Sequence, residues 1–191
     1  MNNISIKIRE VIHPLLIGSV KIVRNYPLHY KAQIKHIDDK PCIFVVNHSN
    51  VHDVPTVCEI INEHFYLLAG DEVKYDIGGF LFNLNGVVWV NRNDKESMNA
   101  SKEKLIELLN KGVNVLIFPE GTWNRTDKIM LPLHWGVIDI ARITGCPIVP
   151  VVMEYSLNNY PECYSKIGEP IIIGNNYEIN GEIQSGFMTE M

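Results

Sequence analysis

Short apolar runs recur along this chain and alternate with stretches whose apolar residues follow helical spacing. Such runs suit buried strands, and their alternation with helices is typical of an α/β domain. We therefore expect one α/β domain with a mixed, mostly parallel sheet flanked by helices. The expected strands are Cys42–Val46, Phe65–Ala69, Val87–Asn91, Asn114–Phe118, Ile148–Met153 and Pro170–Ile173.

Helices are expected between these strands, at Val54–Glu63, Gly78–Leu84, Lys95–Lys111 and Trp135–Thr144. Asp94 is placed to cap the third helix, and Gly112 can supply the left-handed residue that ends it. Gly145 stands at the same place after the fourth helix.

Composition limits the possible classes of protein. The chain has 191 residues, of which 46% are hydrophobic and 20% charged, as in a folded globular domain. The four cysteines lack paired short spacings, which indicates free thiols in a reducing compartment and neither a disulfide framework nor a zinc site. These cysteines are Cys42, Cys58, Cys146 and Cys163.

Charge is unevenly distributed. The net charge of −5 argues against nucleic acid as a partner. Residues 1–40 contain seven Lys or Arg and three Asp or Glu, a local charge of +4, so residues 41–191 carry −9. We divide the chain into an N-terminal amphipathic helical segment (1–40), the main α/β domain (41–175) and a polar C-terminal tail (176–191). A basic arm on an acidic body is a candidate membrane-surface contact.

The N-terminal segment is a poor membrane span. Its longest uncharged run, Val11 to Val20, has ten residues, about half of what a bilayer requires. No small-residue cleavage site follows it, so a secretory signal also fits poorly. Two possibilities remain from the residues alone: an interfacial amphipathic helix, or a helix packed on the domain.

The stretch "VVNHSNVHDVP", Val45 to Pro55, follows the first expected strand and leads into a helix. In open α/β sheets this edge is where ligands usually bind. A turn there can bring Asp53 to one ring nitrogen of His48, leaving the other nitrogen to accept a proton. Asp53 could instead cap the helix that follows it. A metal site is not expected, because adjacent His52 and Asp53 cannot share a helical face.

Two further stretches place polar residues at strand ends. "VLIFPEGTWNRTD" ends a strand at Pro119 and continues with Glu120, Gly121 and Thr122, which could approach and hydrogen-bond a hydroxylated ligand. "GVVWVNR" ends with Arg92, whose donors suit an anionic group. Taken singly, the first could be a capped turn and the second a solvated charge.

Together these stretches resemble the glycerolipid acyltransferase family. "NHSNVHD" is similar to its Asn-His-(four residues)-Asp motif, "GVVWVNR" to its second block, "FPEGT" to its third and "PIVPVV" to its fourth. The resemblance runs from His48 to Val152, in the family's order and spacing.

The resemblance implies acyl transfer to a glycerolipid hydroxyl in phospholipid biosynthesis, most simply that of 1-acylglycerol-3-phosphate. The donor would be a thioester, acyl-coenzyme A or acyl carrier protein, with no bound cofactor. His48 would be the general base and Asp53 its orienter, with Arg92 and the Glu120–Thr122 loop holding the acceptor's head group. The resemblance also favours an interfacial N-terminal segment, and a peripheral location on the cytoplasmic face of a membrane.

The chain departs from the family pattern at two cationic positions. Trp123 follows Glu-Gly-Thr where Arg is usual, and Ala69 stands where a lysine is typical. Arg125 could replace the missing arginine and keep a phosphate-bearing acceptor. Alternatively the acceptor is a less anionic lysolipid or lipid alcohol that packs on Trp123. A metal-dependent hydrolase and a non-catalytic lipid-binding protein on the same scaffold are the rival classes.

Overall fold

The computed structural model describes residues 5–23, 27–31, 34–128, 130–156, 162–174, 178–179 and 182–183. Its helices are α1 (Ile6–Val23), α2 (Asp53–Ile61), α3 (Ile77–Asn85), α4 (Lys95–Asn110) and α5 (Gly136–Thr144), with a short 3-10 turn η1 (Asp71–Val73) before α3. Its strands are β1 (Leu28–Lys31), β2 (Ile43–Val46), β3 (Phe65–Gly70), β4 (Val87–Val90), β5 (Asn114–Ile117), β6 (Ile148–Ser156), β7 (Glu162–Ile167), β8 (Glu178–Ile179) and β9 (Glu182–Ile183).

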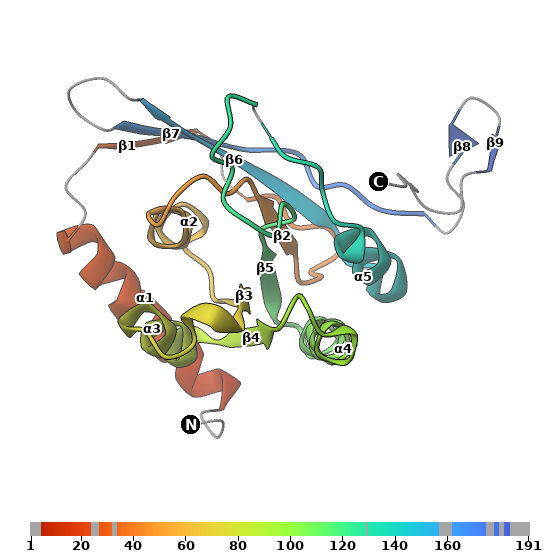
Figure 1. Cartoon of the computed structure of the whole chain (residues 1–191), viewed down its shortest axis with the longest axis horizontal. Helices are drawn as coiled ribbons and strands as arrows, with labels where there is room; N and C mark the ends of the chain where they lie inside the picture. Colours follow the sequence, from red (N-terminus) through yellow and green to blue (C-terminus); the bar gives the residue numbers. More distant parts are fainter. Residues whose placement is uncertain are drawn as a thin grey trace.

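The described strands β1 to β7 form one sheet in the order β1-β7-β6-β2-β5-β3-β4. All neighbouring pairs are parallel except β6 and β7, which pair antiparallel from Val151 to Ser156. Helices α1, α2 and α3 cover one side of the sheet, and α4 and α5 cover the other (Figure 1). The predicted α/β fold with a mixed, mostly parallel sheet is therefore confirmed.

The central strands are buried on both faces, which explains their unbroken apolar sequence. On β2, Ile43 packs towards α4 and α5, while Phe44 and Val46 pack towards α2. All three side chains are fully buried. The carboxyl end of β2, where the first polar motif begins, is thus held at the centre of the sheet.

Five of the six predicted strands are confirmed as β2 to β6. The prediction of a strand at Pro170–Ile173 was wrong, because this segment makes only an isolated bridge between Ile171 and Ile148. Strand β7 was missed: Cys163, Ser165 and Ile167 are buried, but they alternate with exposed residues and form no apolar run. Strand β1, which pairs with β7 at the end of the sheet, was missed as well.

The four predicted helices are confirmed as α2 to α5, with ends that differ by at most two residues. The side chain of Asp94 accepts a hydrogen bond from the Glu96 N–H at 3.0 Å, as a cap should. Gly112 and Gly145 have φ of +79° and +65°, so both predicted helix stops are left-handed glycines.

Helix α1 packs on α2 and α3 with an unusual distribution of side chains. Its buried face carries Arg9, His13 and Ile17, whereas its exposed face includes Ile8, Val11 and Leu15. No helix in the described part of the chain has the length and apolar content to cross a bilayer. The helix is therefore packed on the domain and also presents an apolar stripe outward.

Candidate active site

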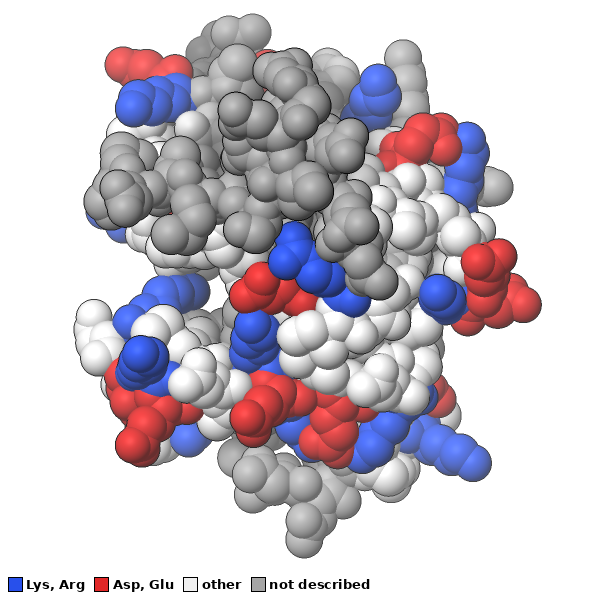
Figure 2. Space-filling view, turned by 90° about the vertical axis from the view of Figure 1, so that its right-hand side faces the viewer, with Lys and Arg blue, Asp and Glu red and all other residues white. Residues whose placement is uncertain are grey.

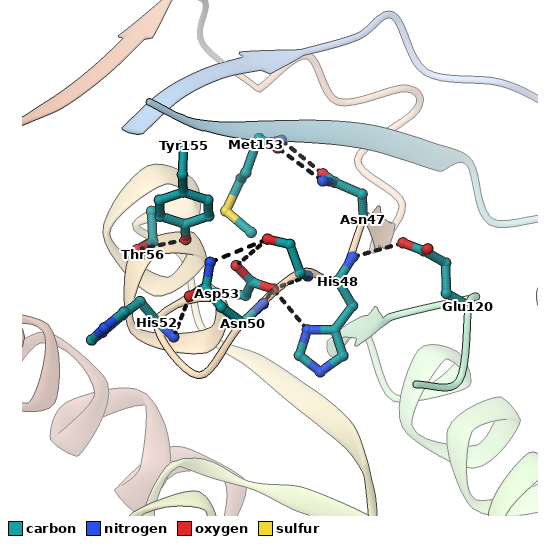
Figure 3. A network of polar contacts seen from close by, with 10 residues as sticks. Asn47, His48, Asn50, His52, Asp53, Thr56, Glu120, Met153 and Tyr155 are labelled. Carbon is teal, nitrogen blue, oxygen red and sulfur yellow. Dashed lines mark hydrogen bonds and ion pairs between the residues drawn. The ribbon is translucent and has the colours of Figure 1, made fainter. Parts of the chain in front are cut away.

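The site centres on His48, in the turn between β2 and α2. Its Nδ1 lies 2.8 Å from Oδ2 of Asp53, and their side chains are 17% and 0% exposed (Figure 3). A carboxylate at this distance accepts the Nδ1 proton, so Nε2 becomes the basic nitrogen. Within the part of the chain that the structure describes, Nε2 has no protein partner. The predicted pair is brought together in the arrangement that a general base needs.

Asp53 is the first residue of α2 and not its cap. The N-cap position is taken by His52, whose side chain makes no capping bond. The Asp53 carboxylate instead accepts backbone N–H bonds from Ser49 at 2.5 Å and Asn50 at 2.9 Å. Backbone N–H donors from the preceding turn thus hold the buried carboxylate in place facing His48. The prediction that Asp53 might also cap the helix was wrong, because the turn folds back over it.

His52 lies on the outer side of the same turn. His52 is exposed, and in Figure 3 its ring points away from His48 and Asp53. Its backbone N–H donates to the Asn50 side chain at 2.8 Å, which helps to shape the turn.

Two aromatic side chains from the segment after β5 flank the His48 ring. Phe118 stacks on it with 4.1 Å between ring centroids, and Trp123 meets it edge-on at 5.9 Å. The Arg125 guanidinium carbon lies over the Trp123 ring, 5.4 Å from its centroid. Trp123 therefore lies between Arg125 and His48 and holds the guanidinium by a cation–π contact.

Glu120 ties this segment to the histidine turn. It is 3% exposed, and its two oxygens accept the backbone N–H of His48 at 2.7 Å and of Leu131 at 2.8 Å. The backbone N–H of Asn124 donates to the His48 carbonyl at 2.6 Å. With both oxygens accepting main-chain donors, Glu120 fixes the position of the base. Its predicted contact with an acceptor head group stays a prediction.

Arg92 and Gly121 meet at the same edge of the sheet. Gly121 has φ of +67°, and a Cβ there would lie 2.9 Å from His134 and 3.7 Å from Nε of Arg92. The left-handed backbone conformation at this position favours glycine. Arg92 also pairs with Glu72 at 3.2 Å, with both side chains well exposed. Thr122 is exposed in the same loop.

The sequence did not point to two residues that organise the site. Asn47 donates to the Met153 carbonyl at 2.8 Å and accepts from the Met153 N–H at 2.7 Å, joining β2 to β6. Tyr155, two residues further along β6, extends its hydroxyl over the start of α2 (Figure 3). Asn47 could have been found from its place next to His48 in the motif. No local sequence pattern indicates Tyr155.

The cysteines are free, as predicted, among the described residues. Burial raises the pKa of Cys58 to about 12, and burial together with Glu63 and Cys146 raises that of Cys42 to about 11. Such thiols are protonated near neutral pH and are poor nucleophiles.

Comparison with known proteins agrees with this geometry. The family model described as "Acyltransferase" matches residues 24–154, more than half of the chain. The chain belongs to the acyltransferase family. The resemblance inferred from the four sequence blocks is thereby confirmed.

Several curated relatives are acyltransferases. The chain is 29% identical over 133 residues to a chloroplastic 1-acyl-sn-glycerol-3-phosphate acyltransferase of Brassica napus, covering 67% of this chain and 38% of that protein. It is 31% identical over 116 residues to the human beta enzyme of the same name, covering 59% and 41%. It is 27% identical over 124 residues to a lyso-ornithine lipid O-acyltransferase of Pseudomonas aeruginosa, covering 64% and 46%. The chain thus spans less than half the length of these relatives.

A solved structure shares the fold. The 1-acyl-sn-glycerophosphate acyltransferase PlsC of Thermotoga maritima superposes with a TM-score of 0.69 at 21% identity, covering 86% of this chain and 70% of that one. At this identity the likeness concerns the arrangement of the sheet and helices.

Proposed function

We propose that this protein transfers a fatty acyl group from a thioester donor to the hydroxyl of a glycerolipid, with 1-acylglycerol-3-phosphate as the acceptor. The observation that carries the proposal is the 2.8 Å contact between His48 Nδ1 and the buried Asp53 carboxylate. This contact leaves Nε2 available as a base, at the sheet edge where α/β proteins bind ligands. The names of the similar proteins support the substrate class.

The chemistry needs no covalent enzyme intermediate. Nε2 of His48 takes the proton of the acceptor hydroxyl as its oxygen attacks the thioester carbonyl carbon. The resulting imidazolium is stabilised by the anionic Asp53 carboxylate. When the tetrahedral intermediate collapses, the carbon–sulfur bond breaks and the imidazolium returns the proton to the leaving thiolate. The products are a diacyl lipid and a free thiol of coenzyme A or acyl carrier protein.

Two arginines are available for an acceptor phosphate. Arg125 lies over Trp123, next to the base, and Arg92 lies against Gly121. The exposed pairing of Arg92 with Glu72 is weak in water, so a phosphate can compete for it. These positions support Arg125 as the replacement for the arginine that Trp123 displaces.

We also propose that the protein works at the cytoplasmic surface of a membrane. Apolar side chains are exposed on α1, on α3 and on the turn that precedes α3, and they support this location. Helices α1 and α3 pack against each other, so these side chains belong to one part of the molecule. These side chains are Ile8, Val11, Leu15, Tyr75, Ile77, Phe80 and Leu81. An apolar surface of this kind binds a bilayer without crossing it.

The first test is an acyl-transfer assay in detergent micelles, with acyl-coenzyme A and acylated acyl carrier protein as alternative donors. His48→Ala should lower kcat/KM by about a thousandfold or more, because the base is removed. His52→Ala is the matched control in the same turn and should keep wild-type kinetics. Wild-type activity in His48→Ala would overturn the mechanism.

A second acceptor class is favoured by Trp123 itself and by the likeness to the lyso-ornithine lipid enzyme. Arg125→Ala should raise the KM for lysophosphatidate about tenfold, as expected for a lost charge-assisted hydrogen bond. Uncharged and zwitterionic lysolipids provide the comparison. Unchanged lysophosphatidate kinetics together with faster acylation of a zwitterionic lysolipid would assign the second class.

A further inference from the structure

Three segments leave the carboxyl ends of β5, β3 and β4, which are neighbours and run parallel in the sheet. Gly121 follows β5, Glu72 lies in η1 after β3, and Arg92 follows β4. Gly70 and Val90 are partners in the register of β3 and β4. Glu72 and Arg92 each come two residues after these partners. The sheet therefore brings an acidic and a basic side chain together at the edge that holds the candidate site.

Glu72 and Arg92 form an ion pair at this edge. Nη1 of Arg92 donates to Oε1 of Glu72 at 3.2 Å, and both side chains are reached by solvent. Nε of the same guanidinium lies 3.7 Å from the point where a Cβ of Gly121 would stand. The carboxylate thus uses a donor that an acceptor phosphate at this edge would need.

Gly70 allows the Glu72 side chain to fold back over the end of β3. A Cβ at Gly70 would overlap both carboxylate oxygens of Glu72. The backbone there is extended, with φ of −65° and ψ of 144°, so the conformation itself does not require glycine. The missing side chain at this position therefore makes room for the carboxylate that meets Arg92.

We propose that Glu72 is a specificity-determining residue of the acceptor site: its carboxylate occupies Arg92 until an anionic head group displaces it. The proposal rests on the proposed function, in which Arg92 binds the acceptor phosphate. A phosphomonoester carries a charge of about −1.5 to −2 at neutral pH, more than one carboxylate, and can take the guanidinium from Glu72. An uncharged lysolipid cannot. Glu72 therefore lowers the affinity for anionic head groups and excludes those with no more charge than its own.

The test measures the KM for lysophosphatidate in Glu72→Gln and in Gly70→Ala. Glu72→Gln removes the competing charge, whereas Gly70→Ala keeps the charge but displaces the carboxylate from the end of β3. Each should lower the KM about threefold, because an exposed ion pair is weak, and leave kcat near its wild-type value. The KM for an uncharged lysolipid should not fall. An unchanged or higher KM for lysophosphatidate in both variants would overturn the proposal.

Each variant has a matched control. Glu103→Gln removes the same charge from an exposed position on α4. Gly78→Ala adds a methyl group where a Cβ meets no atom within 4 Å. Both controls should keep the wild-type KM for lysophosphatidate.

Arg92→Gln shows whether the effect passes through the arginine. In the Arg92→Gln background, Glu72→Gln should no longer lower the KM for lysophosphatidate, because the competition has lost its object. A decrease of the same size in that background would overturn the proposal, since the carboxylate would then act through its charge alone.

Binding of glycerol 3-phosphate makes the result independent of turnover. An NMR titration follows the Nε–H signal of Arg92, which Arg92→Lys assigns, and the dissociation constant should fall about threefold in Glu72→Gln. If no acceptor is acylated but this constant still falls, the proposed function fails while the competition stands. If lysophosphatidate is acylated and the constant does not fall, the competition fails while the proposed function stands.

Discussion

The two helical layers of this domain differ in which polar side chains they bury and which apolar ones they expose. In the layer of α4 and α5, Leu105, Leu109 and Ile140 are buried. The outer surface over these helices carries interspersed charges of both signs (Figure 2). Lys102 pairs there with Asp139 at 2.8 Å. This is the pattern of an ordinary water-facing layer.

The layer of α1, α2 and α3 departs from this pattern, because it buries charged and polar side chains beside its apolar ones. Arg9, His13 and Asp53 are among its buried residues, while Val11 and Ile77 are 69% and 85% exposed. Polar groups inside this layer orient the base and dock α1. The apolar groups outside it are what a surface in contact with lipid requires. The comparison separates a helical layer that faces water from one that carries the candidate site and an exposed apolar stripe.

The largest expected effect on stability comes from the buried arginine of the second layer. Arg9 donates to the carbonyls of Asn83 and Leu84, the last turn of α3, and is 7% exposed. Arg9→Met leaves these carbonyls without the donor and should lower the free energy of unfolding by about 2–4 kcal/mol. Urea denaturation measures it.

Lys102→Met in the first layer is the matched control for Arg9→Met. Its ion pair with Asp139 is one-third to one-half exposed, so the expected change is at most about 1 kcal/mol after solvent screening. Equal losses in the two variants would show that the layers do not differ in this way.

A smaller effect is expected on membrane binding. Val11→Asp places a charge on the exposed apolar stripe of α1 and should weaken binding to phosphatidylcholine–phosphatidylglycerol vesicles about tenfold. Ile143→Asp makes the same kind of change on α5, where the side chain is 60% exposed. Vesicle sedimentation should find this control unchanged. Identical weakening by both would assign the binding surface elsewhere.

The smallest expected effect is a pH dependence of α1 docking. Burial lowers the pKa of His13 and of His64, whose rings meet edge-on at 5.6 Å. The unfolded chain then binds protons that the folded chain does not. The two neutral histidines therefore contribute to the free energy of unfolding. This contribution is complete above the ordinary histidine pKa of 6.5 and is lost as the pH falls through the lowered pKa.

His13→Asn tests this dependence, since it removes one titrating group and keeps a polar side chain near Asn85. The free energy of unfolding, measured from about pH 7.5 to 5.5, should fall less steeply than in wild type. His29→Asn, at an exposed histidine of β1, should keep the wild-type slope. A steeper fall in His13→Asn would contradict the direction of the effect.

The fold class and the His48–Asp53 pair were readable from the sequence because both depend on local patterns. Buried central strands such as β2 and β5 require unbroken apolar runs, and Gly112 and Gly145 mark helix ends through a backbone conformation that other residues rarely adopt. The spacing of His48 and Asp53 spans one turn, so local folding alone brings them together.

Other features required contacts between distant segments. Charge and length alone describe residues 1–40 in the sequence, whereas the packing of Arg9 on α3 links positions 74 and 75 residues apart. The roles of Glu120, Asn47 and Tyr155 likewise depend on strands β5 and β6 lying on either side of β2. The sequence by itself determined the central strands β2 to β6, the helices α2 to α5 and the turn that pairs His48 with Asp53. Only the tertiary structure decided which donors surround that base, because hydrogen bonds and burial across the sheet leave no periodic trace in the chain.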